Sequence, residues 1–176
     1  MKLVPALALA LVCTVGACHS VSGALRTLPP DQAKVAFERL KSLDGRWAGQ
    51  ARHGGDPFPV EVSYHVTAGG SAVEEKLFVG TEHEMVTMYH MDGDHLMLTH
   101  YCVAGNQPSM VARCDPNMDV LKFTFSHATN MKSEDEMHMH SGSIRFVDAD
   151  HIEAVWSGMS GGKPEGDAVF VVARVR

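Results

Sequence analysis

The amino-acid sequence predicts an all-β protein, an antiparallel up-and-down β-barrel of eight to ten strands with one short N-terminal helix. Residues 59–67 alternate strictly between apolar and polar side chains, which is the pattern of a strand with one buried face. Asp92-Gly93 lies between two strand-like runs and is a strong hairpin signal. Further short runs of this kind, separated by close turns, fill the chain, and closing them into a barrel leaves no exposed sheet edge.

The N-terminus has the features of a secretory signal. Lys2 is followed by an apolar stretch that ends at Ala17 and is too short to span a bilayer. Val15-Gly16-Ala17-Cys18 resembles the lipobox of bacterial lipoproteins, in which the cysteine is lipidated and becomes the new N-terminus. The alternative is cleavage after Ser22-Gly23-Ala24, which would release a soluble periplasmic or secreted protein. Both alternatives predict export. The first predicts a periplasmic lipoprotein that is anchored to the membrane.

The chain therefore divides into a signal peptide at 1–17, a linker at 18–30 and a single barrel domain at 31–176. Without the signal, 14 basic residues stand against 21 acidic ones, a formal charge of −7. An acidic chain without a basic cluster is not expected to bind nucleic acid. Contact with a membrane is expected only through a lipid on Cys18.

Apolar residues at helical spacing predict one helix of about three turns over 31–43, with Pro30 and Asp31 at its start. Asp44-Gly45 ends it. Ten strands are expected after it, at 46–52, 59–67, 72–79, 83–91, 94–102, 109–114, 119–126, 137–147, 151–158 and 167–175.

Two segments resemble known proteins. Gly45-Arg46-Trp47, directly after the expected helix, resembles the Gly-x-Trp element that starts the first strand of lipocalins. Residues 85–102, with Gly105-Asn106-Gln107-Pro108 after them, resemble a family of uncharacterised bacterial exported proteins with a lipocalin-like, calycin-type domain. The resemblance covers about 37–176 and implies a barrel without an established activity or ligand. Ten strands are also found in fatty-acid-binding proteins and in the haem-carrying nitrobindins, whose ligand-binding residues have no matching motif here.

Side chains can be sorted by face, because apolar residues on a strand mark the barrel interior and every second residue shares their face. A two-residue turn at Asp92-Gly93 would pair Met85 with His100 and His83 with Cys102. The candidate ligand-binding residues inside the barrel are then Glu75, His83, Tyr89, His100, Cys102, His138, His140 and Trp156. Burying so many polar groups without partners would cost about 1–3 kcal/mol each, so they must bond to each other, to water or to a ligand.

Three functions follow from this interior. The first is an exported carrier or sensor with a small molecule or haem in the barrel, which predicts a cavity of at least about 300 Å³. The second is a periplasmic protein that binds copper or zinc through His100, His138 and His140, which predicts that these imidazoles converge on one point. The third is a structural or interaction module whose polar interior is only an internal network.

The remaining sequence features argue against catalysis and against a disulfide. The sequence contains no Gly-x-Ser-x-Gly, no His-Glu-x-x-His and no phosphate-binding glycine loop, so no enzymatic activity is expected. A short loop near Gly105 would bring Cys102 opposite Ser109 or Met110 on the next strand. Cys114 would then lie beyond disulfide distance, and we expect that the two cysteines do not pair.

Overall fold

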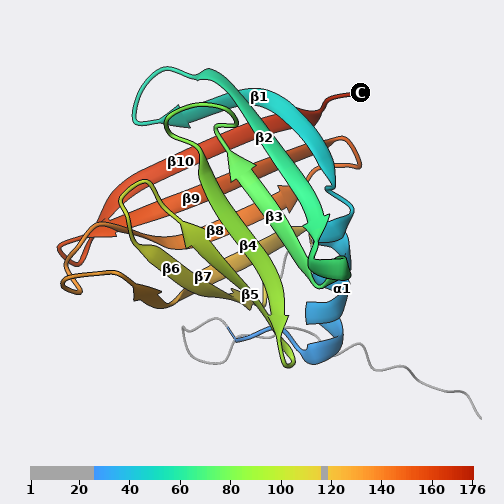
Figure 1. The fold of residues 1–176 in the computed structure, drawn as a ribbon, viewed down its shortest axis with the longest axis horizontal. Coiled ribbons are helices and arrows are strands. Elements are labelled where there is room, and N and C mark those ends of the chain that lie inside the picture. The colour runs from blue at the N-terminus through green and yellow to red at the C-terminus, as the bar shows by residue number, and fades with distance from the viewer. Residues whose placement is uncertain (1–25, 116–118) are drawn as a thin grey trace, which may run out of the picture.

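The computed structural model describes residues 26–115 and 119–176, and within them the chain forms a closed antiparallel barrel of ten strands with one α-helix (Figure 1). The strands follow one another around the barrel in chain order, and β1 closes it by pairing with both β2 and β10. The predicted fold class is therefore confirmed. The proposed signal peptide and the proposed lipidation site at Cys18 lie outside the described residues.

All ten predicted strands are present, with bounds that differ from the predicted ones by up to four residues. The elements are α1 (Pro30–Lys41), β1 (Gly45–His53), β2 (Phe58–Thr67), the 3₁₀ turn η1 (Ala68–Gly70), β3 (Ala72–Leu77), β4 (Met85–Asp92), β5 (His95–Tyr101), β6 (Gln107–Arg113), β7 (Val120–Thr129), β8 (His138–Phe146), β9 (His151–Ser160) and β10 (Lys163–Arg174).

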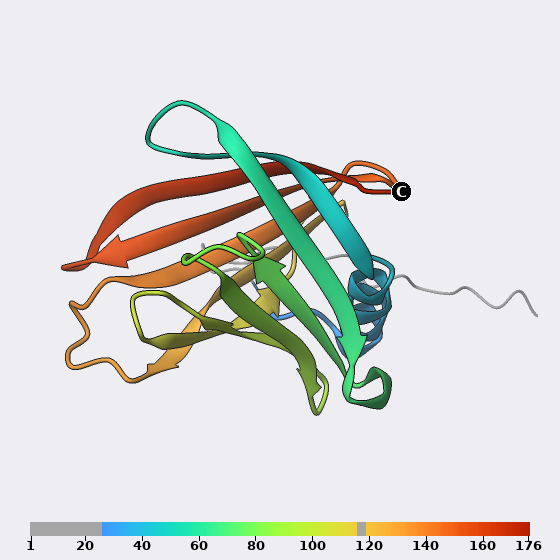
Figure 2. The ribbon, with the colours of Figure 1, turned by 45° about the horizontal axis from the view of Figure 1, so that its top comes forward.

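The helix α1 lies at the end of the barrel where β1 begins (Figure 2). It buries Phe37 and Leu40. Just beyond it, the indole N–H of the fully buried Trp47 donates to the Leu43 carbonyl at 2.8 Å. The guanidinium of Arg174, at the end of the last strand, lies 4.4 Å from the centre of the Trp47 ring on the first strand. We call this the helix end, and the opposite end, where β1 joins β2 and β7 joins β8, the far end.

No described helix has the combined length and apolar character needed to cross a bilayer. The described end of the predicted linker contacts the barrel. Thr27 forms a β-bridge with Arg113, and the Leu28 N–H donates to the Ala112 carbonyl at 3.3 Å. Residues 27 and 28 therefore lie beside β6.

The β4–β5 hairpin differs from the predicted register. Asp92 pairs with His95, so Gly93 is the first of two central turn residues, with a φ of 55°. A type II′ turn requires glycine at that position, whereas the sequence prediction placed it second. The pairing shifts by two residues, and His100 faces Thr87 instead of Met85. Because a two-residue shift preserves the faces, the inward direction of His100 is unaffected.

The two cysteines of the barrel do not pair with each other. Cys102 is free and half-buried, so it forms no disulfide with Cys114. Cys102 lies just past the end of β5, whereas Cys114 follows β6 at the helix end, so the expectation that they stay apart is confirmed.

Gly49 is the position where the barrel wall tolerates no side chain. A Cβ there would lie 2.1 Å from the Val171 carbonyl oxygen on the neighbouring β10. We expect Gly49→Ala to lower the free energy of unfolding by about 2 kcal/mol, because the β1–β10 ladder must move apart. Urea unfolding measures this, with Gly55→Ala as the control, since nothing lies within 4 Å of a Cβ at Gly55. Equal losses in both variants would contradict the prediction.

Candidate functional site

Inside the barrel, polar side chains form a continuous row across four neighbouring strands. The strand registers place Tyr64 opposite Glu75, Glu75 opposite Thr87, and Thr87 opposite His100. Residues directly opposite each other on antiparallel strands have their Cβ atoms about 5 Å apart, so each pair can form a hydrogen bond. The row lies between β2 and β5 and consists of residues that are at most 2% exposed.

Glu75 is the centre of this row. The Tyr64 hydroxyl donates to its Oε1 at 2.7 Å, and the Tyr89 hydroxyl donates to its Oε2 at 3.0 Å. Burial raises the pKa of Glu75 above its usual value, and the hydrogen bonds from the tyrosines and Thr87 oppose that rise. Burial, followed by the nearby Glu75, raises the pKa of both tyrosine hydroxyls. Both carboxyl oxygens therefore have a donor, and the three groups satisfy one another.

His100 ends the row with one nitrogen satisfied. Its Nδ1 lies 2.9 Å from the Thr87 hydroxyl, and its ring lies 4.8 Å from the Trp156 ring. Its Nε2 is buried and has no hydrogen-bond partner among the described residues. Burial lowers the pKa of His100 to about 4, so the imidazole is neutral near pH 7.

A second group of polar residues lies at the far end, where the ladder between β7 and β8 stops at Thr124 and Ser141. His138 and His140 both pack against Phe125, with ring centres 4.8 and 5.0 Å from the phenyl ring. The His138 Nε2 lies 3.1 Å from the His140 Nδ1. The two histidines predicted to share one face of a strand therefore do meet.

The hydrogen bonds determine which nitrogens hold protons. The His138 Nδ1 lies 2.8 Å from the Glu136 carbonyl oxygen, which can only accept, so Nδ1 is the protonated nitrogen. The Nε2 of neutral His138 then accepts from the Nδ1–H of His140. Burial lowers the pKa of His140, and the repulsion that a protonated His138 would exert lowers it further. Neutral His140 consequently keeps a lone pair on its Nε2.

Beside this pair lies a cavity of about 570 Å³, which we call the far-end cavity. It occupies the place where β7 and β8 no longer pair, and the 130–137 connection contributes to its wall. Its lining residues are Phe125, Ser126, His127, Ala128, Met131, Ser133, Glu134, His138, His140 and Met159.

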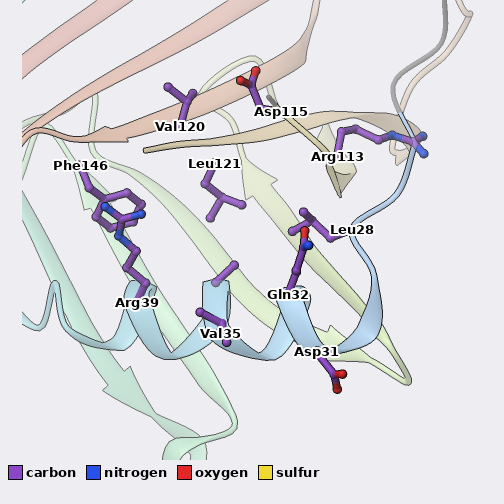
Figure 3. A pocket seen from close by; sticks show the side chains of 11 residues that line it. Leu28, Asp31, Gln32, Val35, Arg39, Arg113, Asp115, Val120, Leu121 and Phe146 are labelled. Carbon is purple, nitrogen blue, oxygen red and sulfur yellow. The ribbon is translucent and has the colours of Figure 1, made fainter. Parts of the chain in front are cut away.

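A smaller cavity of about 310 Å³ lies at the helix end, between α1 and the ends of β6, β7 and β8. Figure 3 shows Val35 on α1 and Leu121 on β7 on opposite sides of it. The Arg39 guanidinium covers the Phe146 ring at 4.1 Å. This cavity contains none of the residues that the sequence indicated as ligand contacts.

The structure does not bring all the predicted site residues together. His83 lies in the connection before β4, with its side chain 70% exposed, because β4 starts only at Met85. Cys102 lies beyond the end of β5 and does not face His83. His100 contacts Thr87 and Trp156, whereas His138 and His140 contact Phe125 and each other. No group of three His, Cys, Asp or Glu residues in the described part of the chain could hold a metal, so the predicted three-histidine centre is not formed.

Sequence reasoning missed two contributors. Tyr64 lies on the inward face of the alternating run at 59–67, so the sequence predicts its inward direction. Its bond to Glu75 depends on the β2–β3 register, which the sequence does not give. Asn106 is fully buried and donates from Nδ2 to the Met137 carbonyl at 2.7 Å, joining two far-end connections. Its place in Gly105-Asn106 indicated only a turn.

The comparisons with known proteins support the fold alone. No family model and no curated protein matches the chain. Rv2717c from M. tuberculosis has a similar structure, with a TM-score of 0.56 and 16% sequence identity over 80% of this chain and 98% of that one. A protein of unknown function from the DUF3598 family of Nostoc punctiforme PCC 73102 gives a TM-score of 0.43 at 11% identity, over 77% of this chain and 49% of its own. At these identities the chain is similar to Rv2717c in its barrel, and its function must be argued from its own residues.

Proposed function

We propose that this protein is an exported binding protein that holds a small ligand in the far-end cavity, beside Phe125, His138 and His140. The observation that supports the proposal is the coincidence of an open cavity with two imidazoles and an aromatic ring. Its volume of about 570 Å³ lies within the usual range for small-molecule sites, about 300–1,000 Å³.

The interior row has a different role in this proposal. Glu75, Thr87 and Tyr89 have no surface accessible to water, and Glu75 already has a donor at each carboxyl oxygen. A ligand there would have to break these bonds and displace packed side chains. The row therefore acts as an internal network that stabilises the barrel, and the ligand binds beyond it.

The apolar N-terminal segment and Cys18 support an exported, periplasmic location with a lipid tether. A carrier or sensor needs the selective binding that the far-end cavity offers and no catalytic group. The chain's lack of a recognised catalytic motif favours binding over catalysis.

Native mass spectrometry of tag-free protein purified from the periplasm tests the proposal. We expect a non-covalent excess mass, present in the native spectrum and absent after denaturation, so that a covalent lipid on Cys18 is not counted. This excess mass should be lost in His138→Leu/His140→Leu because the imidazoles provide its polar contacts. The control is His90→Leu/His95→Leu, on the distant β4–β5 hairpin, which should retain the excess mass. Wild-type protein without any excess mass, or excess mass that survives in the first variant, would contradict the proposal.

A further inference from the structure

The distance between the two imidazole nitrogens at the far end fits a single metal ion. His138 Nε2 and His140 Nδ1 are 3.1 Å apart. With metal–nitrogen bonds of about 2.0–2.1 Å, two nitrogens at this separation subtend an angle of about 100° at the metal. That angle lies between the tetragonal and the tetrahedral values. The ion would replace the proton that the two nitrogens now share. It would lie about 40° off the line between them at each nitrogen, so both rings would turn toward it.

The surroundings of His138 already have the form that metal-binding histidines adopt. Its Nδ1–H donates to the Glu136 carbonyl at 2.8 Å, which fixes the tautomer and leaves the lone pair on Nε2. Such a bond from the second nitrogen to a backbone carbonyl orients the ring and raises the basicity of the ligating nitrogen. For His140, the Nδ1 proton would move to Nε2 through solvent, so binding requires no net loss of a proton.

Sulfur ligands lie on the same cavity wall. Met159 is the direct cross-strand partner of His138 in the β8–β9 ladder, and both residues line the far-end cavity. Directly opposite side chains of an antiparallel pair project to the same side of the sheet. Met131 lines the cavity from the 130–137 connection. The site therefore offers two neutral imidazoles and thioether sulfurs.

This donor set selects among metals. Zinc in proteins almost always takes four ligands from Cys, His, Asp and Glu, and no group of even three of these in the described residues could hold it. Thioether sulfur is a soft ligand that favours copper(I). Copper(I) also accepts two or three ligands, which matches two imidazoles and one methionine.

We propose that the far-end cavity binds one copper(I) ion through His138 Nε2, His140 Nδ1 and the Met159 sulfur. This inference rests on the proposed function and names the chemical class of its ligand. Phe125 packs against both rings and gives the site one apolar side.

An anaerobic titration of the metal-free protein with copper(I) held by bathocuproine disulfonate tests this, with the loss of the chelate absorbance as the readout. We expect one equivalent bound per chain. His140→Gln, at a partly exposed position, should weaken binding by roughly 100-fold. Met159→Leu, which keeps the side-chain volume, should weaken it about tenfold. His95→Gln and Met97→Leu, on the remote hairpin, serve as matched controls and should bind as the wild type does.

X-ray absorption of the loaded protein should show nitrogen and sulfur neighbours, with the sulfur lost in Met159→Leu. Copper binding unchanged in His140→Gln, or zinc(II) bound as tightly as copper(I), would overturn the metal assignment. The two proposals fail separately. An organic mass that depends on the histidines, together with no copper binding, leaves the binding function intact and removes only the metal.

Discussion

Replacing Glu75 by leucine is expected to lower the free energy of unfolding by about 3 kcal/mol. The substitution leaves the hydroxyls of Tyr64 and Tyr89, now bonded to Glu75 at 2.7 and 3.0 Å, without an acceptor in a region closed to water. Each unsatisfied buried hydroxyl costs about 1–3 kcal/mol, and the added apolar contacts of leucine offset part of this. Urea unfolding of the purified variant measures the loss.

The cause can be separated from a simple packing defect. In the triple variant Glu75→Leu/Tyr64→Phe/Tyr89→Phe the orphaned donors are removed together with the acceptor, and most of the lost stability should return. Should Glu75→Leu prove as stable as the wild type, or the triple variant less stable than the single one, the network would not be what stabilises the barrel interior.

The second large effect concerns His100 and pH. Burial lowers its pKa from 6.5 to about 4, so the unfolded chain takes up a proton at a higher pH than the folded one. A depressed folded-state pKa means that the stabilising contribution is complete above about pH 6.5 and is lost as the pH falls toward 4. The difference between the two pKa values corresponds to about 3 kcal/mol over this window.

His100→Gln isolates that contribution. Glutamine can still bond to Thr87 and does not titrate, so the variant should lack the loss of stability between pH 6.5 and pH 4. Unfolding free energies are compared as the difference between wild type and variant at each pH, so that all other groups cancel. Parallel pH profiles for the two proteins would show that His100 does not titrate as its burial requires.

Glu75 should act in the opposite direction. Its pKa is raised by burial, so its contribution is complete below the unfolded value of 4.5 and is lost as the pH rises through the folded value. The stability of the wild type should therefore decline as the pH rises above 4.5, and Glu75→Gln should remove this decline. The measurement is urea unfolding from pH 4 upward, and a wild-type decline that persists in Glu75→Gln would assign it to another group.

The sequence alone determined the fold class, the helix and the ten strands, because the period-2 alternation and the turn residues are local properties of the chain. It also determined which face most side chains occupy. The inward directions of Glu75, Tyr89 and His100 followed from the parity of apolar neighbours such as Leu77 and Leu98. The Gly-x-Trp element correctly marked the start of β1.

The tertiary structure alone decided which of these inward residues meet. Parity places residues on a face but does not fix the register between strands, which depends on the turns. A turn beginning one residue later at Gly93 moved His100 opposite Thr87, and β4 starts too late to include His83.

The separation of the three histidines has the same physical reason. Nothing in the period-2 pattern indicates where a ladder ends, yet the β7–β8 ladder stops at Ser141, and β8 shifts its register to β9 between Met139 and Ser141. These two irregularities bring His138 and His140 together on Phe125 at the far end, beside an open cavity. His100 stays in the closed interior, where it is 1% exposed and lies opposite Thr87 in the β4–β5 ladder.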